Sequence, residues 1–516
     1  MVVGSTVLSQ HVAAQGTLTV AMTAGDLPIT TGTPDQGFEG FRFVGLNLYD
    51  GLMNWDLSRS DRPSDIKPGL ATSWQVDPNN NKRWIFKLRE GVTFHDGCKF
   101  TADDVIWNLE RYTNRDAPQF FSHQFALTRI YLTNLAGYSK IDDMTVALET
   151  KTVDALFPYP MSLVLMISRC RAEQLKHDWA AYAKAPSGTG PYRFIGMVPR
   201  ERMEMAPNKA YWDPTRVPRH DKLVLLPMPE AATRTAALLS GQVNFIEAPA
   251  PDTIARLKSA GMQVVTNIYP HNWAYQLNFV SGPFTDLRVR RAANHAINRA
   301  DVKELLNGLM EEGYSTLPKS MAYYGNPMVY NYDPKKATAL LKEAGCHPCN
   351  VTLAISTSGS GQMQPLPMNE LVKSQLEAVG FKVTLDVMDW NALLDVSRGG
   401  PEKFPKIHGV NISRAAQDPF WGLIRHVAKA HWSPAGGNWG HYYHERTEDL
   451  VARVMAEFDP EKRLALLKEL NEFMNEQAVM IWVAHDINPR AMSPKVKGFV
   501  QAQNWFQDLT PITIAP

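Results

Sequence analysis

The sequence predicts an α/β protein of several domains. Its 516 residues exceed one domain of about 100–200 residues, so roughly two to four domains are expected. In the second half, a strand over 351–356, a helix over 369–378 and a strand over 381–387 form a β-α-β unit, which predicts a partly parallel sheet. Alternating apolar residues predict another strand over 83–89 in the first half.

Other elements follow from alternation, capping residues and glycine stops. Thr101 with Asp104 three residues later is close to a capping box, and an Asp-Pro pair is typical of a helix start. The expected elements are a strand over 16–22, a helix from Thr101, a strand over 192–195, a helix over 230–240, a strand through 243–245, and helices starting at Asp333-Pro334 and Asp459-Pro460.

Composition and charge exclude several classes of protein. Hydrophobic residues make up 44% and charged residues 20%, which is typical of a folded chain. Lys and Arg number 53 against 52 Asp and Glu, whereas a general nucleic-acid binder would be more basic, so no nucleic-acid partner is expected. The 13 Trp and 17 Tyr residues suit cores and ligand clefts alike.

The N-terminal residues favour export. No Asp, Glu, Lys or Arg precedes Asp26, and the run 12–15, Val-Ala-Ala-Gln, resembles the small-residue end of a secretory signal. A basic start is missing, so residues 1–15 are interpreted as either a signal remnant or a plain leader. The best interior apolar run, 155–168, is shorter than the roughly 20 residues that a spanning helix needs.

The four cysteines are few for this length. Cys98 and Cys170 stand alone in the sequence, and no bond is predicted between them. Cys346 and Cys349 form a Cys-x-x-Cys pair, which fits a redox centre, half a metal site or a local disulfide. The pair follows the helix-ending Gly345 and has no second pair to complete a zinc set, so a local disulfide is favoured over inert thiols or redox chemistry.

Eight segments share a more specific pattern. They are GLATSW at 69–74, WIFKLREGVTFHDG at 84–97, FTADDV at 100–105, GTGPY at 188–192, NKAYW at 208–212, ALLSG at 237–241, FTDLRVR at 284–290 and YDP at 332–334. In this order and spacing they resemble the family 5 extracellular solute-binding proteins, the binding components of ABC importers for peptides, nickel and related solutes. The resemblance extends from about residue 16 to the C-terminus.

The resemblance implies a two-lobed periplasmic-binding-protein fold of the class II, or cluster C, type. The core of lobe one would comprise 16–45, 185–265 and 486–516. An extra subdomain of lobe one would occupy 46–184, and lobe two 266–485. Two chain crossings would join the lobes, and ligand would be enclosed between them by hinge closure.

The ligand itself is constrained by one departure from the family. Its peptide receptors hold the ligand's α-amino group with the aspartate of an Ala-Asp-Tyr-x-x-Pro run. The corresponding run 414–419 is Arg-Ala-Ala-Gln-Asp-Pro, so Ala415 replaces that aspartate and Asp418 matches a second acid. An ammonium buried beside Arg414 without a counter-charge would be costly. Arg414 is instead expected to bind a carboxylate or phosphate, or else to bond Asp418 or water.

Aromatic and polar residues of lobe two supply the other candidates. Tryptophans lie after the strand 381–387, near the run 414–419 and in the loop after Asn438, although each alone also fits a core. The polar loop 356–361 follows a strand, where α/β proteins often bind ligands. The ligand-binding candidates are Trp273, Asn278, Ser358, Trp390, Arg414, Asp418, Trp421 and Trp439.

The sequence therefore predicts the substrate-binding component of an ABC importer in the periplasm of a Gram-negative bacterium. It would capture a small organic solute, such as a non-standard peptide, an opine or sugar conjugate, or an aromatic acid or amide. We expect a monomer without enzymatic activity, metal or cofactor, whose partners are the solute and the membrane permease subunits. The alternatives are a di- or oligopeptide receptor, a metal-chelate receptor using His426, His431, His441 and His444, and, more distantly, a secreted hydrolase, although no Gly-x-Ser-x-Gly elbow occurs.

Overall fold

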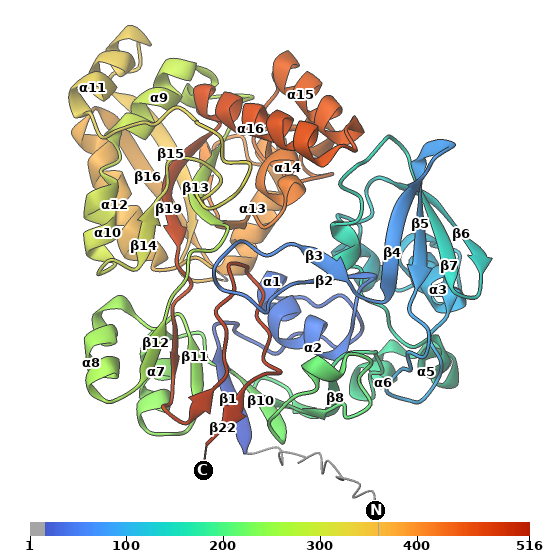
Figure 1. Ribbon diagram of the computed structural model, residues 1–516. Coiled ribbons are helices and arrows are strands. Elements are labelled where there is room, and N and C mark those ends of the chain that lie inside the picture. The colour runs from blue at the N-terminus through green and yellow to red at the C-terminus, as the bar shows by residue number, and fades with distance from the viewer. Residues whose placement is uncertain (1–15, 360, 516) are drawn as a thin grey trace, which may run out of the picture.

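Two lobes, one above the other in Figure 1, make up the described chain. The structure is a computed structural model that describes residues 16–359 and 361–515. The leader or signal predicted for residues 1–15 lies outside this range. Each lobe is built on a β-sheet with helices against it, so the predicted two-lobed α/β class is confirmed.

Lobe one contains a seven-stranded sheet. β1 runs parallel to both of its neighbours, β10 and β11, whereas β20 runs antiparallel to β11 and β12. Helices α7 (Ala231–Leu239) and α8 (Ile254–Ser259) pack on it through Leu238 and Leu257. In sheet order the strands are β12 (Gln263–Val265), β20 (Arg490–Met492), β11 (Phe245–Glu247), β1 (Thr17–Met22), β10 (Lys222–Pro227), β9 (Arg202–Pro207) and β8 (Tyr192–Val198).

A second, four-stranded sheet stands beside lobe one, at the right of Figure 1. Its order is β4 (Ala71–Asp77), β5 (Asn80–Leu88), β7 (Thr145–Thr150) and β6 (Leu135–Asp142). The predicted strand is confirmed in β5, where Trp84, Phe86 and Leu88 are buried. Helix α3 (Ala102–Thr113) begins at the predicted capping box, in which Thr101 and Asp104 bond each other's backbone N–H groups.

Lobe two has its own seven-stranded sheet. The predicted β-α-β unit is confirmed, because β15 and β16 run parallel and α12 (Pro365–Ala378) lies between them in sequence. The helix begins at Pro365 and not at residue 369, because proline is tolerated in the first turn, where its missing N–H has no partner to lose. The main order is β14 (Met310–Glu312), β19 (Met480–Asp486), β13 (His271–Leu277), β17 (Gly409–Asn411), β15 (Cys349–Ser356) and β16 (Phe381–Met388), with β18 (Arg414–Ala415) paired to β13.

The remaining elements cover these sheets or connect them. Asp333 and Asp459 cap α11 and α16 with their side chains, as predicted. The other helices and strands are α1 (Gly37–Gly40), α2 (Leu46–Leu48), β2 (Met53–Trp55), β3 (Ile66–Pro68), α4 (Ser122–Thr128), α5 (Arg169–Gln174), α6 (Trp179–Lys184), α9 (Leu287–Ala296), α10 (Arg299–Leu305), α11 (Pro334–Glu343), α13 (Trp390–Lys403), α14 (Arg425–Val427), α15 (Glu445–Ala456), α16 (Pro460–Glu476), β21 (Val496–Lys497) and β22 (Thr513–Ile514).

The chain passes between the lobes twice, from β12 into β13 and from β19 back into β20. The second passage is the red segment that descends from β19 in Figure 1. Ala415 and Trp421, which follow lobe two's β17, belong to the hydrophobic core cluster of lobe one. The lobes are therefore in direct contact along this seam.

Two disulfides are present. Cys346 and Cys349 are joined, which confirms the predicted local disulfide. Cys98 and Cys170 are also joined, so the expectation that they stand alone is wrong. Their bond spans 72 residues, a distance over which sequence spacing says nothing about contact.

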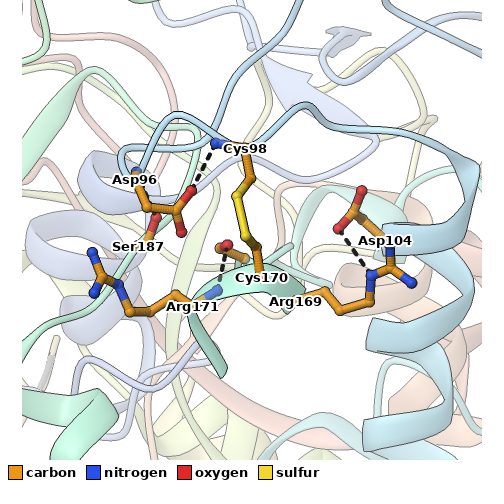
Figure 2. The surroundings of a disulfide bond; sticks show 8 residues. Asp96, Cys98, Asp104, Arg169, Cys170, Arg171 and Ser187 are labelled. Carbon is orange, nitrogen blue, oxygen red and sulfur yellow. Dashed lines mark hydrogen bonds and ion pairs between the residues drawn. A yellow bond between two sulfur atoms is a disulfide. The ribbon is translucent and has the colours of Figure 1, made fainter. Parts of the chain in front are cut away.

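The fold brings these two distant cysteines together at the start of α5. Figure 2 shows the turn that carries Cys98 facing the first residues of this helix. Asp96 accepts the backbone N–H of Cys98 at 2.9 Å and donates its own N–H to Ser187 at 3.1 Å. Ser168 accepts the N–H of Arg171 at 3.1 Å and so caps α5 beside Cys170. Ordinary turn and cap chemistry therefore holds both sides of the bond.

Candidate functional site

A pocket of about 180 Å³ lies between the lobes. Its walls come from lobe one, from the loop after β15 in lobe two, and from the segment that follows the second crossing. Ser358 lines this pocket, as do Gly359 and Gly361 of the same loop, so the loop that the sequence singled out does face the other lobe. Trp505, in the returning segment, also lines the pocket.

Ionised groups in this pocket are largely paired with each other. Glu247 forms ion pairs with Arg42 and Arg490, the latter at 2.6 Å, and all three are buried. Glu39 accepts hydrogen bonds from Thr23 and from the backbone of Ala24. Burial, and then the nearby Glu247, raise the pKa of Glu39 to about 6. This wall suits polar groups of a ligand more than an uncompensated charge.

Aromatic side chains make the direct contact between the lobes. Trp421 of lobe two lies 5.0 Å from Phe38 and 5.7 Å from Tyr131 of lobe one, between ring centroids. Trp505 lies 4.8 Å from His271, at the start of β13. Among the described residues, the Nε1 atoms of Trp421 and Trp505 are buried without a hydrogen-bond partner. Both indoles therefore bring a donor to the seam that the protein itself does not use.

Arg414 lies next to the same seam. It is in β18, which pairs with the first residues of β13. Its Nη2 donates to Ser397 Oγ at 2.6 Å and, at 3.4 Å, to Gln276 Oε1, both neutral groups. Its Nε is buried without a partner among the described residues. Burial lowers the pKa of Arg414 well below its usual value, and the charges of Arg425 and Arg398 lower it further.

Asp418 does not pair with Arg414. Its Oδ1 accepts the backbone N–H of Trp421 at 2.9 Å, which caps the short helical turn that follows. Burial raises the pKa of Asp418 to about 7, against the backbone N–H groups of Trp421 and Phe420 and the charge of Arg425, which lower it. The carboxylate is thus turned towards its own backbone.

The polar atoms of three other predicted residues form hydrogen bonds inside lobe two. Trp273 donates to Gln362 O at 3.1 Å, and Trp439 donates to Val396 O at 3.0 Å; each indole is at most 1% exposed. Asn278 accepts the backbone N–H groups of the turn after β13. In these three cases the core or turn interpretation of the residue accounts for its contacts.

Trp390 has an intermediate position. It is the first residue of α13 and is only partly buried. Its ring lies beside Gly359 of the pocket loop, so close that a Cβ on that glycine would be 2.3 Å from it. Trp390 therefore supports the loop that carries Ser358.

Sequence reasoning did not single out Arg425, which follows Trp421 by one helical turn. Its guanidinium carbon lies 4.1 Å from the centroid of the Trp421 ring, and its Nε is buried without a partner among the described residues. An aromatic residue followed by arginine at i+4 is a usable sequence signal, because the two share one helix face. Unpaired buried atoms also occur on Gln417 and on several amides of 501–507.

Three of the four histidines proposed for metal binding make other hydrogen bonds. His426 bonds Gln276, His441 bonds Ser433, and His444 caps α15. The described residues contain no group of three or more His, Cys, Asp or Glu side chains placed to hold a metal ion. In the same part of the chain, no helix has the length and apolarity needed to cross a membrane.

Comparison with known proteins identifies similar sequences over most of the chain. Residues 65–414 match the family described as bacterial extracellular solute-binding proteins, family 5. The dipeptide-binding protein of Escherichia coli (strain K12) is 26% identical over 492 residues, covering 91% of this chain and 90% of that protein. The glutathione-binding protein GsiB of Pectobacterium atrosepticum is 27% identical over 464 residues, covering 88% and 86%.

Solved structures share the fold over almost the whole chain. The periplasmic binding protein DppA from Helicobacter pylori, in complex with the peptide STSA, has a TM-score of 0.84 at 23% identity and covers 98% of this chain and 99% of its own. The binding protein AgaA, in complex with agropinic acid, has a TM-score of 0.80 at 22% identity, with 97% and 99% covered. At these identities the likeness establishes the architecture and not the ligand.

Proposed function

Since the chain belongs to the bacterial extracellular solute-binding proteins, family 5, we propose that it captures one small organic solute between its lobes and delivers it to the permease subunits of an ABC importer. The solute would be a non-standard peptide, an opine or sugar conjugate, or an aromatic acid or amide. It would lie at the seam where Trp421 meets lobe one, with Ser358 and Trp505 at the adjoining pocket.

The incomplete hydrogen bonding of the buried Arg414 side chain is the observation that supports this choice of ligand. Among the described residues, the buried guanidinium bonds Ser397 and Gln276 and retains an unpaired N–H, which an acidic or polar group on the solute would satisfy. The Coulomb attraction between a buried cation and an ionic partner is also stronger where water is excluded.

An ordinary peptide held by its free amine fits this site poorly. Ala415 is 5% exposed and offers no carboxylate, and Asp418 already accepts backbone N–H groups. An ammonium at this place would also lie near the charge of Arg414, which costs free energy in a buried site.

We further propose that the protein works in the periplasm of a Gram-negative bacterium, as a monomer that performs no chemistry on its solute. The two disulfides support an oxidising compartment. We also propose the following domain bounds: the core of lobe one comprises 16–45, 185–265 and 486–516, its subdomain comprises 46–184, and lobe two comprises 266–485.

Isothermal titration calorimetry with a panel of di- and tripeptides, sugars, opines, and aromatic acids and amides tests the proposal. Arg414→Ala should weaken binding of the accepted solute by about 2–5 kcal/mol if it pairs with a buried anionic group. Arg453→Ala is the matched control, because this arginine is exposed on α15 and forms a surface ion pair with Asp449.

Two outcomes would contradict the proposal. One is tight binding of ordinary peptides that Asp418→Ala abolishes and Arg414→Ala leaves intact, which would restore the peptide receptor. The other is turnover of a bound solute, which would restore the hydrolase alternative.

A further inference from the structure

The surroundings of Arg425 differ from those of a structural arginine. No hydrogen bond or ion pair joins its side chain to any described residue, although it is only 5% exposed. The ring of Trp421 covers it at 4.1 Å. The backbone of Gly437 packs against it, since a Cβ there would lie 2.4 Å from Nε. Apolar and backbone surfaces thus fix the guanidinium in place while its donors stay unused.

Neutral groups link Arg414 to the backbone of Trp421, whose ring covers Arg425. Gln276 accepts from Arg414 through Oε1 and bonds His426 Nδ1 at 3.0 Å through Nε2. His426 Nε2 in turn lies 3.0 Å from the carbonyl oxygen of Trp421. Burial lowers the pKa of His426 well below its usual value, so the ring is uncharged between the two arginines. Gln417, also uncharged, brings two more unpaired amide atoms to this region.

The acid nearest in sequence, Asp418, forms no ion pair with either arginine within 4.0 Å in the described structure, and its Oδ1 is bonded to the Trp421 N–H. Burial lowers the pKa of Arg425, but the charge of Asp418 is near enough to raise it. The other arginine that influences Arg414 is Arg398, which is 64% exposed and reaches Asp395. The lobe-two wall thus carries two buried cations with no bonded anion.

We propose that Arg425 is a second anion-binding residue, and that the solute enters with two negative charges, as a dicarboxylate or a phosphate monoester shared between Arg414 and Arg425. The inference rests on the proposed function, because it assigns a charge class to the solute of that same site. The two guanidiniums differ in their contacts, since Arg414 bonds Ser397 and Gln276 whereas Arg425 packs against Trp421 and Gly437.

The physical reason is the cost of burying charge. An arginine in a dry site gains most when a carboxylate or phosphate supplies both charge and acceptor atoms. One monovalent group would leave the second guanidinium without a bonded anion, and the two are near enough that Arg425 already lowers the pKa of Arg414. A solute with two anionic charges compensates both, and closure then excludes water from both pairs.

Matched compounds that differ in negative charge test the inference on the wild-type protein; the carboxylate pairs differ by one charge, and the sugar pair by one phosphate group of about −2. Calorimetry would compare benzoate with phthalate, isophthalate and terephthalate, gluconate with glucarate, and glucose with glucose 6-phosphate. At least one dianion should bind 10-fold or more tightly than its partner of lower charge. The dicarboxylate and phosphate arms separate the two sources of charge.

Variants assign the preference to its residues. Arg425→Gln and Arg414→Gln should each reduce the preference for the dianion to less than 3-fold. Arg425→Lys should retain part of this preference, and Arg453→Gln should leave it unchanged. Thermal unfolding shows whether each variant is folded. If Arg425→Gln is not folded, the wild-type comparison of compounds and the Arg425→Lys variant still test the inference.

The outcomes separate the two proposals. Equal binding of a monoanion and its dianion, with Arg425→Gln indistinguishable from wild type, overturns the inference while the solute receptor stands. Failure of every compound, including the larger panel of peptides, sugars, opines and aromatic acids, overturns both.

Discussion

Phe38 of lobe one and Trp421 of lobe two meet edge to face, with ring centroids 5.0 Å apart and ring planes at 65°. The contact joins residues from opposite sides of the seam, and Arg425 lies on the same indole. The indole that supports Arg425 within lobe two is therefore the same one that contacts lobe one.

Solute binding should therefore shift the protein towards the closed arrangement. Small-angle X-ray scattering should give a smaller radius of gyration with saturating solute, because two-lobed receptors enclose ligand by hinge closure. Tryptophan fluorescence should change with the same midpoint, since Trp421 and Trp505 both lie at the seam. An unchanged scattering profile at full occupancy would contradict binding between the lobes.

Gly361→Ala should weaken solute binding by 10-fold or more. A Cβ at Gly361 would lie 2.4 Å from Trp505 and 2.6 Å from His271, so the loop could not rest against the returning segment. Gly345→Ala is the matched control, because its φ of 68° is close to the 70° of Gly361 but nothing lies within 4 Å. Both changes carry the same backbone penalty of about 1 kcal/mol. Calorimetry with the accepted solute should therefore separate them, and equal losses would show that only backbone strain matters.

Protein purified from the periplasm should contain both disulfides. Its intact mass should rise by about 4 Da on reduction, two hydrogens per bond, and free thiols would remove the support for an oxidising compartment.

The two disulfide bonds should differ in how much they contribute to the free energy of unfolding. Cys98→Ser with Cys170→Ser should cost about 4 kcal/mol, because that bond spans 72 residues. Cys346→Ser with Cys349→Ser should cost about 2 kcal/mol for a separation of 3. Urea unfolding measures both, and the reverse order would contradict the loop-closure argument.

Asp418→Asn should change how stability depends on pH. Because the pKa of Asp418 is raised to about 7 in the folded protein, the folded state holds a proton that the unfolded chain releases near pH 4. The stability of the wild type should fall as pH rises from about 4 to 7, by at most about 4 kcal/mol for this group. Asparagine keeps the cap without titrating, so the free energy of unfolding of the variant should increase relative to that of the wild type between pH 5 and pH 8.

Asp459→Asn provides the opposite case. Asp459 is also a helix cap, but its pKa is lowered, mainly by the backbone N–H of Lys462. The ionised Asp459 therefore contributes to stability above about pH 4, and this contribution is lost in acid. The stability of Asp459→Asn relative to wild type should not increase between pH 5 and 8. Urea unfolding of both variants at the two pH values checks the prediction. Parallel pH profiles for wild type and Asp418→Asn would show that the carboxyl is ionised throughout.

The sequence predicted those parts of the fold that depend on local pattern. The strand through Trp84, the capping box at Thr101 and the Asp-Pro helix starts all need only neighbouring residues, and the structure has each of them. The bond between Cys98 and Cys170 could not be predicted in this way, because it depends on where the chain returns after 72 residues.

The candidate site was predicted only in part for the same reason. Trp273, Trp421 and Trp439 are the same residue type in similar surroundings, yet only Trp421 meets the other lobe. Which indole reaches the seam depends on the packing of whole elements. Strand ends in a β-α-β unit have a fixed position, so the loop that carries Ser358 could be located from the sequence, and it lines the pocket. The lack of a bonded partner for Arg425 among the described residues depends on tertiary packing, so the sequence alone could not indicate it.

The place of β20 in lobe one has a consequence for the order of synthesis. This strand, residues 490–492, lies between β11 and β12, so a chain still emerging through a membrane cannot complete its first sheet until it has nearly finished the second lobe. Until then β11 keeps an unpaired edge, which is open to pairing with other chains. A nascent chain of this topology would gain from a chaperone that shields lobe one, and a nonsense change shortly before residue 490 should expose both lobes to proteolysis and not just trim one end.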